Sequence, residues 1–170
     1  MRGGGAQAAG DVFGDEPRFH VVLHEPEIPN NTGNIGRTCV ATGCSLHLIH
    51  PLGFSLYEKA RRRAGLDYWP RLELLEHGSW EAYRQAYGAA RVWICTTRGG
   101  RSVHDVGFCA GDHLVFGKET RGLPASVREG LEDRMVTLPM VAGERSLNLA
   151  TAVSAVVYVA MGSVVRAGGG

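Results

Sequence analysis

The chain has 170 residues, of which 44% are hydrophobic and 21% are charged, and its formal net charge is +1. This length and composition are typical of one globular domain with a sizeable core, and the near-zero charge argues against a general nucleic-acid coat. Residues 1–17 are rich in Gly and Ala and contain no apolar run of a secretory signal. We expect a disordered tail over 1–17, one domain over 18–166 and a loose end over 167–170.

The four cysteines show no CxxC pair and no metal-ligand spacing, and the seven histidines are scattered along the chain. This pattern indicates reduced thiols in a cytoplasmic protein and predicts no metal site. The cysteines are Cys39, Cys44, Cys95 and Cys109.

Predicted strands and helices alternate along the chain. Asn30, Asn31 and Thr32 offer N-caps to a helix that Gly43 ends, and Ser79 caps another. This alternation predicts an α/β domain with a mostly parallel sheet flanked by helices. Strands are expected at 19–24, 46–50, 72–75, 91–96, 113–116 and 135–138, and helices at 30–42, 56–64, 80–87, 124–129 and from 149 onward.

The last predicted helix carries no charge before Arg166. The uncharged run over residues 146–165 has the length of a membrane span. Seven of its positions are Ser, Asn, Thr, Tyr or Gly, and Leu, Ile and Phe are nearly absent. We therefore expect a helix buried in a core or against a partner subunit, and no membrane span.

Three loops that follow predicted strands carry unusual polar content, at residues 25–37, 117–123 and 139–148. Ligands of parallel α/β folds bind at the carboxyl ends of strands, so we expect the site there. The alternatives are ordinary structural roles. Arg37 could be a side chain that extends from an amphipathic helix, and Glu119 with Arg121 could be a weak surface ion pair.

Several common catalytic signatures are missing from the sequence. It contains no GxGxxG after the first strand, no P-loop, no HExxH and no GxSxG elbow. By elimination the candidate site combines Arg, Glu, Asn and Ser with glycines, and it has no obvious nucleophile or metal.

Positive charge is concentrated in one short segment, which contains Lys59, Arg61, Arg62 and Arg63. One interpretation is the solvated face of a helix. The other is a patch that contacts phosphates on a protein whose remaining surface is neutral.

Three motifs in this order resemble the small SPOUT-class (SpoU-type) RNA 2′-O-ribose methyltransferases. They are NNTGNIGRT from Asn30, VFGKETRGLP from Val115 and RSLNLATAVSAVVY from Arg145. The resemblance covers residues 19–161 and looks closest to single-domain tRNA enzymes that methylate the wobble nucleotide, cytidine or uridine 34, of leucine tRNAs.

The resemblance implies a deep trefoil knot in the C-terminal part of the α/β domain. It also implies a homodimer that packs through the C-terminal helix, whose small Ala, Ser and Thr residues would pack against the partner's copy. We therefore expect Glu at Val156 or Val157 to yield monomers or aggregate.

The resemblance further implies S-adenosylmethionine as the cofactor, held largely by main-chain groups of three loops. The binding positions that it implies are Cys95, Thr96, Gly117, Leu138, Met140, Ser146 and Leu147.

For catalysis the family points to Arg37, Glu119, Asn148 and Asn31. A guanidinium is effectively always protonated, so we expect Arg37 to stabilise the developing alkoxide or to bind the adjacent phosphate rather than to act as a base. Arg121 and Arg145 are expected to contact RNA. Two alternatives are the same chemistry on another tRNA position or on ribosomal RNA, and a non-catalytic RNA-binding protein of the same fold.

Overall fold

The computed structural model describes residues 16–56 and 67–168. Most of the expected N-terminal tail and of the expected helix at 56–64 lies outside these residues. The basic residues of that segment therefore also lie outside the described part of the chain, namely Lys59, Arg61, Arg62 and Arg63.

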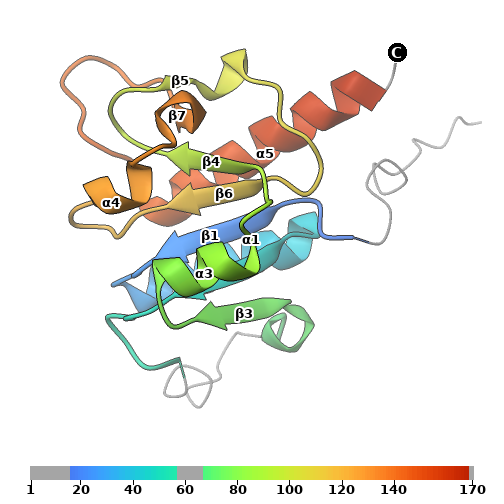
Figure 1. Ribbon diagram of the computed structural model, residues 1–170. Helices are drawn as coiled ribbons and strands as arrows, with labels where there is room; N and C mark the ends of the chain where they lie inside the picture. Colours follow the sequence, from blue (N-terminus) through green and yellow to red (C-terminus); the bar gives the residue numbers. More distant parts are fainter. Residues whose placement is uncertain (1–15, 57–66, 169–170) are drawn as a thin grey trace, which may run out of the picture.

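A seven-stranded parallel sheet forms the centre of the molecule (Figure 1), which confirms the predicted fold class. The strand order is β3-β2-β1-β6-β4-β7-β5, so β1 and β6 lie side by side although the chain separates them widely. The strands are β1 (His20–His24), β2 (Ser45–Ile49), β3 (Leu74–His77), β4 (Val92–Cys95), β5 (Arg101–Ser102), β6 (His113–Phe116) and β7 (Met135–Thr137).

Helices cover both faces of the sheet (Figure 1). The longer helices α1 and α5 pack on one face and contribute Ile35 and Val153 to the larger buried cluster. On the other face Tyr83 of α3 and Val127 of α4 belong to a second buried cluster. The helices are α1 (Pro29–Thr42), α3 (Trp80–Ala86), α4 (Ala125–Arg128) and α5 (Leu149–Gly168), with short 3-10 turns η2 (Trp69–Arg71), η3 (Val103–Asp105) and η4 (Glu132–Arg134).

The ends of two helices test the predicted capping signals. Ser79 caps α3 as predicted, because its side chain accepts a hydrogen bond from the backbone N–H of Ala82. The prediction for α1 is wrong. The helix begins at Pro29 with Ile28 as N-cap and no side-chain cap bond, so Asn30–Thr32 lie inside its first turn.

The strand boundaries differ from the prediction at the two edges of the sheet. The strand expected at 72–75 lies at Leu74–His77, because the η2 turn occupies the preceding residues. Arg101, expected in a loop, begins the short edge strand β5. Both differences leave the positions of the central strands unchanged.

Two residues of α5 that the sequence singled out are buried in the core of their own chain. Val156 and Val157 are 2% and 0% exposed, so Glu at either position would disrupt the subunit itself and would not test the dimer alone. The exposed apolar residues of α5 are Tyr158 and Val165, which are 60% and 41% exposed. By length and composition α5 is the one helix within the described residues that could cross a membrane. Here it packs against α1, and the Thr38 and Ser154 hydroxyls lie 2.9 Å apart.

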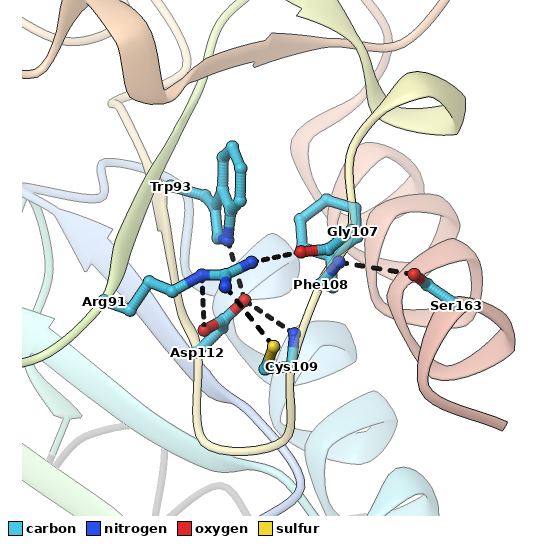
Figure 2. Close-up of polar contacts among 7 residues, drawn as sticks. All are labelled: Arg91, Trp93, Gly107, Phe108, Cys109, Asp112 and Ser163. Carbon is cyan, nitrogen blue, oxygen red and sulfur yellow. Dashed lines mark hydrogen bonds and ion pairs between the residues drawn. The ribbon is translucent and has the colours of Figure 1, made fainter. Parts of the chain in front are cut away.

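A buried carboxylate ties the amino-terminal ends of β4 and β6 together (Figure 2). Asp112 Oδ2 accepts hydrogen bonds from Trp93 Nε1 at 2.7 Å and from the Cys109 N–H at 2.9 Å, and its Oδ1 lies 3.2 Å from Arg91 Nε. The backbone N–H of Phe108 donates to Ser163 Oγ of α5 at 3.3 Å. Burial raises the pKa of Asp112, and the hydrogen bonds and Arg91 oppose that change.

Four histidines form a connected row across the sheet under α3, one each from β1, β2, β3 and β6. His47 is central, with its two ring nitrogens 3.0 Å from His20 and 2.9 Å from His77, while His113 stacks on His20 at 4.1 Å between ring centroids. Burial lowers the pKa of His47 and of His113 to about 3. Burial also lowers the pKa of His20 and of His77, so this row is a neutral hydrogen-bonded core. The described residues contain no cluster of His, Cys, Asp or Glu arranged to hold a metal ion.

Candidate active site

A cavity of about 780 Å³ lies at the carboxyl ends of β4, β6 and β7, where the sequence placed the site. This volume is within the usual range of small-molecule sites, roughly 300–1,000 Å³. The structure brings every expected cofactor position to its lining: Cys95, Thr96, Gly117, Leu138, Met140, Ser146 and Leu147.

Gly117 lines the cavity and is also required by the fold of its own loop. A Cβ at this position would lie 2.6 Å from the Gly122 Cα and would overlap the backbone of the same loop even more closely. The Gly122 N–H donates to the Lys118 carbonyl at 2.9 Å and so closes a tight loop over Gly117. The glycine therefore permits the fold of the loop that carries Glu119.

The Glu119 carboxylate accepts three hydrogen bonds from residues 27–31. Its Oε2 accepts the backbone N–H of Glu27 at 2.8 Å, and its Oε1 accepts that of Ile28 and the Asn31 side-chain amide, both at 3.1 Å. These backbone donors lie at the start of α1, where N–H groups have no intrahelical acceptor. A carboxylate is also favoured at the positive end of a helix dipole. Glu119 thus supplies the cap that α1 lacks locally.

Asn148 extends this network to the third loop. Its Nδ2 donates to Asn31 Oδ1 at 3.0 Å. Its Oδ1 accepts the backbone N–H groups of Ala150 at 2.9 Å and Thr151 at 3.3 Å, so Asn148 caps α5. Three of the four expected catalytic residues therefore form one chain of hydrogen bonds, Glu119–Asn31–Asn148, which joins the three loops.

A second set of contacts fastens the first loop to the second. Glu27 Oε2 accepts the Thr120 hydroxyl at 2.8 Å and the Thr120 N–H at 3.1 Å, and the hydroxyl bond lowers the pKa of Glu27. Lys118 Nζ lies 2.6 Å from Glu25 Oε2. Glu25 has φ +50, a strained value for a residue with a side chain. These contacts hold the loops in one arrangement.

Arg37, the fourth expected catalytic residue, lies apart from this network. It is exposed on α1 and does not line the cavity. Its guanidinium carbon lies 4.8 Å from the centroid of the Tyr68 ring, and the Tyr68 hydroxyl donates to the Gly33 carbonyl at 2.6 Å. Burial raises the pKa of Tyr68. Tyr68 thus supports Arg37, a contact that motif spacing alone did not predict.

The cavity is lined by more arginines than the sequence suggested. Arg121 and Arg145, expected to contact RNA, both line it. Arg98, which follows β4, and Arg128, the last residue of α4, line it as well, and sequence reasoning missed both. Neither belongs to one of the three motifs, so only the fold brings them to the site.

Cys95 lines the cavity with a thiol that burial keeps protonated, because its pKa is raised far above the ordinary value. A protonated thiol is a poor nucleophile and a poor metal ligand. The polar groups left for chemistry at the site are guanidinium, ammonium, carboxylate, amide, hydroxyl and main-chain groups.

The fold and this cavity define an α/β enzyme that binds its ligands at the carboxyl ends of parallel strands. The family model of the SpoU rRNA Methylase family matches residues 18–158, and the chain belongs to this family. The resemblance inferred from the three motifs is confirmed.

Similar proteins share most of their length with this chain. The tRNA (cytidine(34)-2′-O)-methyltransferase of Saccharophagus degradans is 48% identical over 141 residues, which are 82% of this chain and 92% of that protein. The protein of the same name from Escherichia coli K12 is 46% identical over 141 residues, which are 82% of this chain and 90% of that protein.

Solved structures show the same fold. One that concerns 2-OH methylation of C/U34 on tRNA is 44% identical, superimposes with a TM-score of 0.82, and is matched over 90% of this chain and 99% of its own. The SpoU methyltransferase AviRb of Streptomyces viridochromogenes, in complex with AdoMet, is 25% identical with a TM-score of 0.77. The superposition covers 94% of this chain and 62% of AviRb.

Proposed function

We propose that this protein is a tRNA (cytidine/uridine-34)-2′-O-methyltransferase that uses S-adenosylmethionine. The observation that carries the proposal is the convergence of all seven expected cofactor positions on one cavity, beside a hydrogen-bonded chain that joins the three motif loops. The relatives named for methylation of nucleotide 34 match this chain over 90% or more of their length.

The cavity suits S-adenosylmethionine in its chemistry. Apolar side chains of Leu138 and Leu147 line it together with Thr96 and Ser146, so a flat base and polar groups can both be accommodated. The Thr96 N–H already donates to the Val136 carbonyl at 2.9 Å, which fixes the ends of β4 and β7. When bound there, the cofactor supplies a methyl group on a positively charged sulfur.

Glu119, Asn31 and Asn148 act in this proposal as positioning residues. Their hydrogen bonds join them to another loop, to a helix end or to each other. The network fixes the walls of the cavity, so that a ribose hydroxyl and the methyl group can meet in line. Such alignment supplies a large part of the acceleration of two-reactant steps.

In this proposal Arg37 donates hydrogen bonds to the reacting RNA. A fixed guanidinium stabilises the alkoxide that develops at the ribose 2′-oxygen or binds the adjacent phosphate. The attacking hydroxyl releases its proton to water or to a phosphate. Because Arg37 does not line the cavity of its own chain, this role requires the RNA or a second subunit to bring the reacting groups to it.

A homodimer through α5 is part of the proposal. The exposed side of α5 carries Thr151, Tyr158 and Val165 at intervals of seven residues, and the partly buried small residues Ala155 and Gly162 lie between them. These spacings place all five on one face. An apolar helix face without charge is costly to expose, and small residues allow a second helix to approach closely.

The finer properties follow from the family resemblance. We propose a C-terminal trefoil knot, leucine tRNAs as substrates and a location in the cytoplasm. We also propose that Arg121, Arg145 and the basic segment around Lys59 contact RNA phosphates. Ribosomal RNA is the second candidate substrate. It is favoured less, because the relatives named for cytidine 34 of tRNA are 46–48% identical to this chain and are covered to 90% or more.

Nucleoside mass spectrometry tests the proposal in cells. A strain that lacks the gene should lose 2′-O-methylcytidine or 2′-O-methyluridine from the anticodon loop of leucine tRNAs, and a plasmid copy should restore it. Loss of a methyl group from ribosomal RNA with unchanged tRNA would favour the second candidate.

A further inference from the structure

Cationic side chains outnumber carboxylates in the lining of the cavity. Lys118 pairs with Glu25, and the Glu119 carboxylate accepts two backbone N–H groups and an amide. Four guanidinium groups remain, and within the described part of the chain none of them has a carboxylate at ion-pair distance. They belong to Arg98, Arg121, Arg128 and Arg145.

Arg128 is the most buried of these four. Its Nε is buried and has no hydrogen-bond partner, whereas Arg98, Arg121 and Arg145 are exposed. A buried polar group without a partner costs free energy, and a cation that lines a cavity recovers this cost when an anion binds. The preceding residue, Val127, is buried in the second core cluster at 2% exposure, and this packing fixes the position of α4.

The cofactor does not account for this amount of positive charge. S-adenosylmethionine has one carboxylate, and its sulfonium and ammonium groups are cations. One carboxylate takes one bidentate guanidinium, so at least three guanidinium groups are left without an anionic partner from the cofactor. A nucleotide within an RNA strand has a phosphodiester on each side of its ribose, and guanidinium forks match phosphate oxygens.

We propose that Arg128, together with Arg98, binds a phosphodiester of the RNA strand next to the target ribose. This inference rests on the proposed function, because it names a contact of the same site with its RNA substrate. It adds a second phosphate contact, on the β4 and α4 side of the cavity, to the contact expected from Arg121 and Arg145. It also makes Arg128 a residue that positions the strand from within the cavity.

The test measures RNA binding and cofactor binding separately. The probe is an anticodon stem-loop RNA with cytidine at position 34, and its affinity is measured by fluorescence anisotropy with S-adenosylhomocysteine present. Arg128→Ala and Arg98→Ala should each weaken RNA binding about tenfold, as expected when a charge-assisted hydrogen bond is lost. Each should also lower the slope of log affinity against log salt by about 0.7. Calorimetry without RNA should show unchanged affinity for S-adenosylhomocysteine and S-adenosylmethionine.

Arg84→Ala is the matched control. Arg84 is also half-buried and also has a buried nitrogen without a partner, Nη1, but it lies on α3 and does not line the cavity. Its loss should leave RNA affinity within about twofold of the wild type. Arg128→Lys, which keeps the charge without the fork, should bind RNA with an affinity between those of the wild type and Arg128→Ala. It also provides the test at this position if Arg128→Ala does not fold.

Two results would overturn the inference. One is a loss of S-adenosylmethionine affinity with RNA affinity intact, which would assign Arg128 and Arg98 to the cofactor carboxylate. The other is RNA binding by both variants that matches Arg84→Ala. If the wild-type protein neither binds the stem-loop nor methylates it, the proposed function itself fails, which is a different outcome.

Discussion

Glu27 and Glu119 each bind the backbone of the other's loop. Glu119 Oε2 accepts the Glu27 N–H at 2.8 Å, and Glu27 Oε2 accepts the N–H of Thr120, the neighbour of Glu119, at 3.1 Å. Two carboxylates separated by 92 positions thus form a reciprocal pair of contacts between the first and second motif loops. The pair explains why both loops carry acidic residues beside an arginine-rich cavity.

The first prediction concerns stability at this contact. Glu119→Ala removes the acceptor of two backbone N–H groups at the start of α1 and should lower the free energy of unfolding by about 1–3 kcal/mol. Thr120→Val keeps the backbone donor to Glu27 and loses the hydroxyl bond alone, so it should cost less. Urea denaturation followed by circular dichroism measures both. Equal stability of Glu119→Ala and wild type would show that water replaces Glu119 without cost.

The second prediction concerns Arg37. Arg37→Ala should lower the maximal methylation rate by about a hundredfold or more, because a donor to the developing charge is lost. Affinity for S-adenosylmethionine should stay unchanged, since Arg37 does not line the cavity. Arg37→Lys keeps the charge but loses the fork and should recover little. Single-turnover kinetics at saturating tRNA decides the matter, and a variant with reduced tRNA affinity but a normal saturated rate would refute the catalytic role.

The third prediction concerns assembly. Tyr158 is 60% exposed in the middle of the apolar face of α5, so Tyr158→Glu should convert a dimer into a folded monomer with reduced activity. Gln85→Glu introduces the same charge at an exposed position of α3 and should remain dimeric. Sedimentation velocity at micromolar concentration separates the species. A wild-type protein that is fully active as a monomer would contradict the dimer.

The fourth prediction concerns pH. The pKa of His47 and of His113 is about 3 in the folded protein, below the ordinary 6.5, because burial disfavours their charged forms. Between pH 6.5 and 3 the unfolded chain therefore binds more protons than the folded one, and stability falls as the pH falls. Each histidine whose protonation is fully suppressed contributes a loss of about 2 kcal/mol between pH 7.5 and 5.

Urea denaturation at several pH values measures this loss. His113→Gln removes one titrating group, so the free energy of unfolding of this variant should depend less steeply on pH than that of the wild type. A wild-type stability that stays constant between pH 7.5 and 5 would contradict the neutral histidine row.

Much of the central architecture could be predicted from local signals. Gly43 ends α1 in the left-handed conformation at φ 68, and Ser79 caps α3, because both signals act within a few residues. The meeting of the three loops also followed from the sequence, since the carboxyl ends of parallel strands lie at one edge of a sheet. These inferences needed no knowledge of long-range contacts.

The features that the sequence did not predict depend on distant residues. The N-terminus of α1 is capped by Glu119, which lies 91 positions from Ile28, so no local pattern could reveal it. The buried side of α5, which includes Val156 and Val157, could not be identified from the sequence, because a helix without charges gives no sign of which side meets water. Arg128 reaches the cavity through the position of α4, which follows from the sheet order.

Methyl transfer to a defined RNA distinguishes ribose methylation of nucleotide 34 from any other activity of this protein. The purified protein is incubated with S-adenosylmethionine that carries a labelled methyl group and an anticodon stem-loop of a leucine tRNA. The product is then digested and analysed by mass spectrometry. A matched stem-loop has 2′-deoxycytidine at position 34 and is otherwise identical. We expect one methyl group per RNA, on the ribose of nucleotide 34, and no transfer to the deoxy substrate. Equal methylation of both RNAs, or a methyl group on a base, would contradict it.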